Sequence, residues 1–307
     1  SILVCYPISA LFKLRIEEYL LIIFTVVPIF TIGLSEDLGL RMSPARRLAA
    51  CIVSGTLVIL FFDVWVSKVG IPGFDVILSI TPFAIVFTLF ATTGVCNAFN
   101  LVDGINGFAS YVSISIALSL SIAAYQVNVP ELSIFLALLI SAIFGFFILN
   151  FPFGKLFLGD SGAYTLGHIL VWLAVILTNF DDTISPFAIL LIFFWPIADT
   201  GLAIYRRWQL GAPADKPDRL HFHQLVMRFL EIWFLGRAKR SVSNPLAALI
   251  LVPLVSMPQI LGIMYLRNLP ITIFLTIIMS GLFVTTYLFG IKLARSKLIS
   301  SYRKLQQ

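Results

Sequence analysis

Four polar residues recur every three positions in the stretch NAFNLVDGINGF, residues 97–108, which lies between two apolar runs. They are Asn97, Asn100, Asp103 and Asn106. At helical spacing they would share one face, and the glycines among them allow tight turns and close approach to a ligand. A simple interfacial turn also uses Asn and Gly for local hydrogen bonds, but it does not need four polar residues in register. We therefore predict that this stretch binds a ligand.

An acidic pair, Glu36 and Asp37, lies in the stretch GLSEDLGLRMSPARR, a few residues before three arginines. Magnesium keeps several waters and prefers one or two carboxylates together with substrate phosphate oxygens. Arginine is well suited to phosphate. The stretch therefore suits a metal and phosphate site, and the alternative is a capped helix end with interfacial charges.

Another carboxylate, Asp160, precedes an apolar run in the stretch FPFGKLFLGDSGAYTLG. Asp160 or Ser161 could simply cap the helix that follows. A helix N-terminus also favours phosphate oxygens or a metal-bound anion, and Phe157 is available to stack on a base.

Two further stretches carry ionisable groups. WPIADTGLAIYRR places Asp199 inside an apolar segment, and ADKPDRLHFHQL places Arg219, His221 and His223 close together. Two histidines without a third ligand do not make a zinc site, and such histidines are often solvated or packed. With Arg219 beside them, they could instead bind an anionic sugar phosphate.

These residues must be positioned by membrane helices, because 59% of the chain is hydrophobic, only 12% is charged, and the mean hydropathy is +1.00. The apolar runs are uninterrupted and near the 20 residues that a membrane helix needs. We predict an all-α, polytopic membrane bundle that forms a single domain over residues 1–307. Its nine expected spans are Tyr19 to Leu34, Leu48 to Val66, Phe74 to Val95, Phe108 to Val127, Leu132 to Phe151, Ala163 to Asn179, Pro186 to Tyr205, Pro245 to Leu266 and Leu269 to Ile291. The three cysteines, Cys5, Cys51 and Cys96, are predicted to be packing residues.

Positive charge predicts the orientation of the bundle. The loops 35–47, 96–107, 152–162 and 206–244, with the tail from residue 292, hold 17 of the 21 Lys and Arg residues. These segments are therefore predicted to be cytoplasmic, as is the C-terminus. Asp181 and Asp182 fall in a short outer loop without a basic residue and are interpreted as solvated turn residues. No acidic or basic residue falls near the middle of an expected span, which argues against a transporter.

The chain carries, in this order, an acidic pair after a span, the motifs NAxNxxDGxNG, FxGDSG and PxxDT, and DRxHxH in a large loop. With its motifs in this order, it resembles the polyprenyl-phosphate N-acetylhexosamine-1-phosphate transferase superfamily. The resemblance runs from about Gly33 to the C-terminus. It implies transfer of a HexNAc 1-phosphate from a UDP-sugar to undecaprenyl phosphate, with release of UMP and dependence on Mg²⁺, or alternatively Mn²⁺. This reaction would begin O-antigen or another surface glycan at the bacterial inner membrane, with the active site in the cytoplasm. The family has ten or eleven helices, so we expect one or two further spans upstream.

By resemblance, Asp160 is expected to bind the metal, and Asp37 to be a second ligand or to deprotonate or orient the lipid phosphate. Phe157 is expected to stack on uracil, and Asp103 with Asn106 to contact the nucleoside side of the donor. The pyrophosphate and sugar are expected to be bound by Arg219, His221 and His223. The expected catalytic residues also include Glu36. The expected substrate-binding residues also include Asn100 and Asp199.

Three positions depart from the usual family pattern, since Glu36 replaces an Asp, Asn106 replaces a frequent Asp, and Gln224 stands where many members have His. The alternative function is therefore a catalytically silent relative that binds polyprenyl phosphate or acts as a scaffold. The expected partners are UDP-HexNAc, undecaprenyl phosphate and the bilayer, with a homodimer as one alternative and no nucleic acid.

Overall fold

The computed structural model describes residues 16–211 and 220–304, and in this part of the chain helices are joined by turns and loops, with no strand. The predicted all-α fold is confirmed. The helices are α2 (Ile16–Thr25), α3 (Val27–Asp37), α4 (Pro44–Phe62), α5 (Pro72–Leu78), α6 (Thr81–Val102), α7 (Phe108–Gln126), α8 (Pro130–Asn150), α9 (Gly159–Phe180), α10 (Pro186–Ile192), α11 (Phe194–Leu210), α12 (Phe222–Leu230), α13 (Arg240–Met264) and α14 (Leu269–Lys304). A π-helical turn, Glu231–Leu235, and a 3₁₀ turn, Arg237–Lys239, link α12 to α13.

Seven of the described helices are long and apolar enough to cross a membrane, and an eighth span exists if a bent pair is counted as one. The protein is therefore a multi-pass membrane protein, although two of the nine predicted spans differ from expectation. The run from Pro186 to Tyr205 is broken into α10 and α11, which are bent by 81°. Pro196 has no amide to donate to the carbonyl four residues earlier, which favours a break there.

The other difference is the run from Tyr19 to Leu34, which is divided between α2 and α3 at Val26. Pro28 is at the start of α3 and removes the amide that would bond to the Phe24 carbonyl. Within the described residues, the two halves have 10 and 11 residues, which is too short for either to span a bilayer alone.

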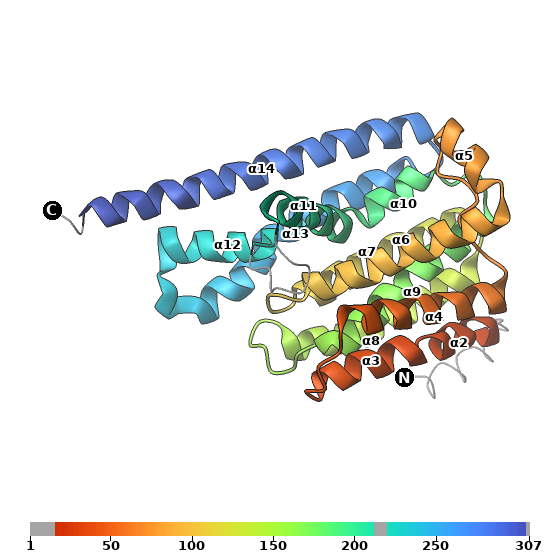
Figure 1. Cartoon of the computed structure of the whole chain (residues 1–307), viewed down its shortest axis with the longest axis horizontal. Coiled ribbons are helices and arrows are strands. Elements are labelled where there is room, and N and C mark those ends of the chain that lie inside the picture. The colour runs from red at the N-terminus through yellow and green to blue at the C-terminus, as the bar shows by residue number, and fades with distance from the viewer. Residues whose placement is uncertain (1–15, 212–219, 305–307) are drawn as a thin grey trace.

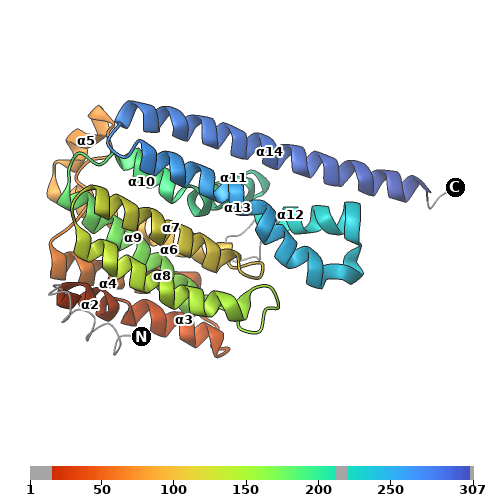
Figure 2. The same cartoon turned by 180° about the vertical axis from the view of Figure 1, so that it is seen from behind.

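The helices form one elongated bundle with its loops gathered at two ends (Figures 1 and 2). The connections α3–α4, α6–α7 and α8–α9 lie at the same end as α12, whereas α5 and the start of α10 lie at the other end. Helix α9 is central, since 78% of its 18-residue apolar stretch is buried inside the protein. It packs against α3, α4, α6 and α7, so residues at its first turn can meet residues from several other elements.

The spans are not free of ionisable side chains, because His168 lies buried in α9. Its side chain is completely buried, and Nε2 lies 3.0 Å from Oγ1 of Thr25 on α2. The Thr25 hydroxyl donates to the carbonyl of Ile22, so it accepts from the imidazole. His168 therefore joins α2 to α9 as a hydrogen-bond donor.

The loops that follow α9 and α13 are bonded to each other more closely than the sequence predicted. The interpretation of Asp181 as a solvated residue was wrong, because its carboxylate accepts from Arg267 at 2.7 Å and from Thr183. The side chain of Asp182 is 91% exposed, as predicted. Of the cysteines, Cys51 and Cys96 are buried as packing residues, and Cys5 lies outside the described residues.

Candidate active site

The carboxylate of Asp37 holds the first turn of α9. One oxygen accepts from the backbone amide of Asp160 at 2.8 Å, and the other accepts from the amide and hydroxyl of Ser161 at 3.0 and 2.6 Å. Helix α3 can bring Asp37 here because Gly33 lies against the same turn, where a Cβ would come within 2.5 Å of Ser161 Cα. Burial raises the pKa of Asp37, but the hydrogen bonds from Ser161 and from the Asp160 amide outweigh it and hold the pKa below its ordinary value.

Asp160 projects from this first turn of α9 toward α6 and α4. Its Oδ1 accepts from the side-chain amide of Asn100 at 2.8 Å, and its Oδ2 lies 3.5 Å from Nη1 of Arg47. The Asp160 side chain remains 24% exposed, so a ligand could still reach it. Arg47 belongs to the basic stretch noted in the sequence, but sequence reasoning assigned it no role at this site.

Asp103 follows the last residue of α6 and lies near both other carboxylates. Burial, then the charge of Asp160, and more weakly the charge of Asp37, raise its pKa to about 6, while a hydrogen bond from the Gly159 amide partly opposes them. The structure thus brings together three carboxylates that are distant in sequence. We call Asp37, Asp103 and Asp160 the carboxylate cluster.

The Glu36 side chain is bonded to the connection between α3 and α4. Its Oε2 accepts from the backbone amide of Met42 at 2.7 Å and fixes the turn between α3 and α4.

Asn106 connects two loops of the site. Its side-chain amide donates to the carbonyl of Pro152 at 2.9 Å, and its backbone amide donates to Oδ1 of Asn244 at 2.7 Å. Next to it, the amide of Gly107 donates to Oδ1 of Asn150 at 2.5 Å. Sequence reasoning missed Asn150 and Asn244, and only the proximity of Asn150 to the FPFGK stretch was a signal for either.

Phe157 lies in the loop between α8 and α9, and its side chain is 79% exposed. It lies three residues before Asp160 and is free to contact a ligand.

Asp199, His221 and His223 form a separate, buried group that we call the histidine clamp. Asp199, on α11, accepts from Nδ1 of His221 at 2.9 Å and from the amide of Phe222 at 3.0 Å, which fixes the start of α12. Nδ1 of His223 lies 3.9 Å from the same carboxylate. Arg219, which was predicted to act with these histidines, lies outside the described residues.

His223 connects the histidine clamp to the NAFNLVDGINGF stretch. A Cβ at Gly104 would come within 2.1 Å of its Nε2, so only glycine allows this approach. Burial lowers the pKa of His223 to about 4, helped by the charge of His221 and opposed by Asp199. The imidazole is therefore neutral at pH 7.

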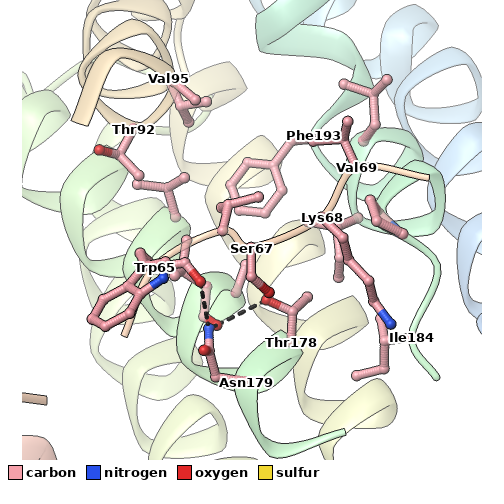
Figure 3. Close-up of a pocket in the computed structure, with 18 of the residues that line it drawn as sticks. Trp65, Ser67, Lys68, Val69, Thr92, Val95, Thr178, Asn179, Ile184 and Phe193 are labelled. Atoms are coloured by element: carbon pink, nitrogen blue, oxygen red, sulfur yellow. Dashed lines mark hydrogen bonds between the residues drawn. The ribbon is translucent and has the colours of Figure 1, made fainter. Parts of the chain in front are cut away.

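A pocket of about 280 Å³ lies toward the other end of the bundle, between α6, α9, the α10–α11 break and the segment after α4 (Figure 3). Its lining includes the polar residues Lys68 and Asn179 and the apolar residues Val95 and Phe193. None of the predicted site residues lines it. The carboxylate cluster and this pocket are therefore separate features.

A sequence model described as glycosyl transferase family 4 matches residues 19–178. The chain is 34% identical over 152 residues to an undecaprenyl-phosphate alpha-N-acetylglucosaminyl 1-phosphate transferase of Yersinia pestis, covering 48% of this chain and 42% of the relative. It is 30% identical over 181 residues to the enzyme of the same description in Escherichia coli strain K12, and the match covers 57% of this chain and 49% of the relative. It is also 30% identical over 187 residues to a phospho-N-acetylmuramoyl-pentapeptide-transferase of Streptococcus pneumoniae, covering 58% and 56%.

The chain spans about half the length of the curated relatives that it matches. The matched residues 19–178 contain the whole carboxylate cluster, whereas the histidine clamp and Asn244 lie beyond them.

Proposed function

Because this chain belongs to glycosyl transferase family 4, we propose that it transfers a HexNAc 1-phosphate from a UDP-HexNAc donor to undecaprenyl phosphate. An oxygen of the lipid phosphate attacks the sugar-linked phosphorus, and the bond from that phosphorus to the bridging oxygen breaks. UMP leaves with the bridging oxygen, and the products are UMP and a lipid diphosphate sugar. The observation that carries the proposal is the carboxylate cluster, which gathers three acidic side chains from separate loops inside the family match.

The residues of the carboxylate cluster fit a Mg²⁺ ion, with Mn²⁺ as an alternative. Asp103 is partly buried and its pKa is raised to about 6 by burial and by neighbouring negative charge, and a bound cation would relieve that repulsion. No group of three or more His, Cys, Asp or Glu side chains is arranged to hold a metal within residues 16–211 and 220–304. Mg²⁺ commonly binds one or two carboxylates and completes its shell with water and phosphate, so Asp160 and Asp103 would suffice. The ion would neutralise the charge of the diphosphate.

Asp37 has a different part in this proposal. Its oxygens already accept three hydrogen bonds from the first turn of α9, so it holds Asp160 in place. A strong general base is not needed, because the lipid phosphate has a second pKa near 6 and is largely dianionic at pH 7. Arg47, at 3.5 Å from Asp160, adds positive charge where the phosphates would lie.

Phe157 offers an exposed ring on which uracil can stack, and Asn100 orients Asp160 through its hydrogen bond. Asn106 contributes by joining two loops rather than by presenting its side chain to the donor. The buried histidine clamp holds the start of α12 against α11. His221 is buried against Asp199, so direct contact with pyrophosphate would require His221 to leave this position.

The excess of Lys and Arg in the loops at this end of the bundle supports a cytoplasmic active site in the bacterial inner membrane. There the protein would begin the assembly of O-antigen or another surface glycan.

The test is to supply membranes that contain the full chain with undecaprenyl phosphate and a panel of UDP-HexNAc donors, and to measure UMP. We expect release of UMP with at least one donor, with UDP-GlcNAc as the first choice, and no release after a chelator removes Mg²⁺. Binding of polyprenyl phosphate without UMP from any donor would favour the silent relative instead.

A further inference from the structure

The turn between α6 and α7 does not satisfy all of its own backbone amides. Gly104 donates to the carbonyl of Val102 at 2.8 Å, and Phe108 donates to that of Ile105 at 3.2 Å. The amide of Asn106 has its acceptor outside the turn, in Oδ1 of Asn244 at 2.7 Å. Since unpaired backbone amides are costly away from water, this turn depends on a side chain supplied from elsewhere.

Asn244 reaches the turn from a firmly anchored helix. It lies in the first turns of α13, next to Ser243, which is completely buried and donates to Glu231. Further along α13, Gln259 donates to Ser115 of α7 at 3.1 Å. A residue on a helix that is bonded along its length can hold a neighbour in place with little motion.

The turn that Asn244 holds also carries Asp103. Asn106 and Asp103 are three residues apart, and the same turn is bonded to the α8–α9 loop through Asn106 and Asn150. A displacement of the turn would therefore move Asp103 relative to Asp160.

We propose that Asn244 is a positioning residue for the turn at residues 103–107, and that by holding this turn it sets the affinity for the nucleotide donor, which the proposed function places there. The second half of this inference rests on the proposed function. Asn244 lies beyond the family match, 138 residues from Asn106, so its role comes from the fold alone.

The first test measures hydrogen exchange of the peptide containing residues 103–108 in the full chain. Asn244→Leu keeps the approximate size of the side chain and removes the acceptor, whereas Asn244→Asp keeps an oxygen at the same place. We expect the peptide to exchange about tenfold faster in Asn244→Leu and as in the wild type in Asn244→Asp. Unchanged exchange in Asn244→Leu would overturn the inference.

The second test measures UMP release as a function of donor concentration. We expect KM for the UDP-HexNAc donor to rise about tenfold in Asn244→Leu, with KM for undecaprenyl phosphate unchanged, and Asn244→Asp to restore the donor KM. A fall in kcat with both KM values unchanged would mean only that less protein is folded, and it would contradict a positioning role.

The matched control is Asn268→Leu, which removes a similar bond to the amide of Ile271 at 3.1 Å, at the other end of the bundle. It should change neither exchange in residues 103–108 nor the donor KM. If the wild type releases no UMP, the proposed function fails, whereas the exchange measurement still decides whether Asn244 holds the turn.

Discussion

The carboxylate cluster and the histidine clamp use the same acidic residue in opposite environments. In the cluster, Asp103 and Asp160 are like charges near each other, and Asp160 keeps 24% of its side chain exposed. In the clamp, Asp199 is 1% exposed and is bonded to His221 and to a backbone amide. The negative charge of the cluster is only partly offset by Arg47, at 3.5 Å from Asp160, whereas the carboxylate of the clamp is satisfied by hydrogen bonds from within the protein.

This difference shows how the surroundings of an aspartate distinguish a binding site from a structural anchor in this chain. Like charges held together are unfavourable unless a cation or a positively charged group joins them. A buried pair with its hydrogen bonds made is self-sufficient, and its loss leaves an uncompensated group. We therefore expect cluster variants to lose activity and clamp variants to lose stability.

The largest effect is expected for Asp199→Ala, which should lower the free energy of unfolding by about 3–5 kcal/mol, because it breaks a buried, hydrogen-bonded pair. Thermal unfolding of the purified protein in detergent would measure it. The exposed Asp182→Ala is the matched control and should have little effect. A melting temperature equal to that of the wild type would mean that the clamp is not an anchor.

Asp160→Asn should reduce UMP release about 10²–10³-fold, since it removes charge from the place where the metal and diphosphate are stabilised. Its melting temperature should stay close to that of the wild type, because the substitution also relieves repulsion with Asp103. The contrast with Asp199→Ala fails if the two variants lose stability equally.

The pH dependence of stability should distinguish the two regions further. The folded pKa of His223 is about 4, against an ordinary value of 6.5, so the unfolded chain takes up the proton first. The contribution of His223 to the free energy of unfolding is fully present above pH 6.5. It decreases as the pH falls and is lost below pH 4, a total decrease of roughly 3 kcal/mol. Measurements of the free energy of unfolding between pH 7 and pH 4 should show this decrease. The His223→Gln variant should depend less on pH over the same range.

Phe157→Ala should raise KM for the UDP donor about tenfold, because stacking of a base on an aromatic ring contributes about 1–3 kcal/mol. The ring is 79% exposed, so stability should not change. Phe153, which is 78% exposed in the same loop, provides the control substitution. Equal effects of Phe153→Ala and Phe157→Ala would argue against a specific stacking position.

The smallest effect is expected for Asp103→Asn in the absence of divalent cations. Removing a carboxylate whose pKa is raised to about 6 should stabilise the fold by about 1 kcal/mol after allowance for solvent screening. Adding Mg²⁺ should stabilise the wild type more than the variant. A variant that is less stable than the wild type without metal would indicate that Asp103 is not under repulsion.

The sequence was sufficient to predict the all-α membrane fold, because long apolar runs can cross a bilayer only as helices. It did not predict the break at Phe193 or the division near Val26. Proline was visible in both places, but membrane helices often tolerate proline, so the residue type alone did not decide between a kink and a break.

For the site, the acidic and amide residues could be predicted to converge because they fall in loops at one end of the bundle. What each of them contacts could not be predicted. Asp37 turned out to bond to the first turn of α9, and Glu36 to a neighbouring turn. Asn244 could not be found at all, since its partner lies 138 residues away and its surroundings in the sequence carry no motif.

The most direct test of the central claim is Mn²⁺ binding to the purified full chain, followed by electron paramagnetic resonance with a UDP-HexNAc donor present. The proposal predicts a bound Mn²⁺ ion in the wild type and in Asp182→Asn, and strongly weakened binding in both Asp103→Asn and Asp160→Asn. Unchanged Mn²⁺ binding in those two cluster variants would contradict it.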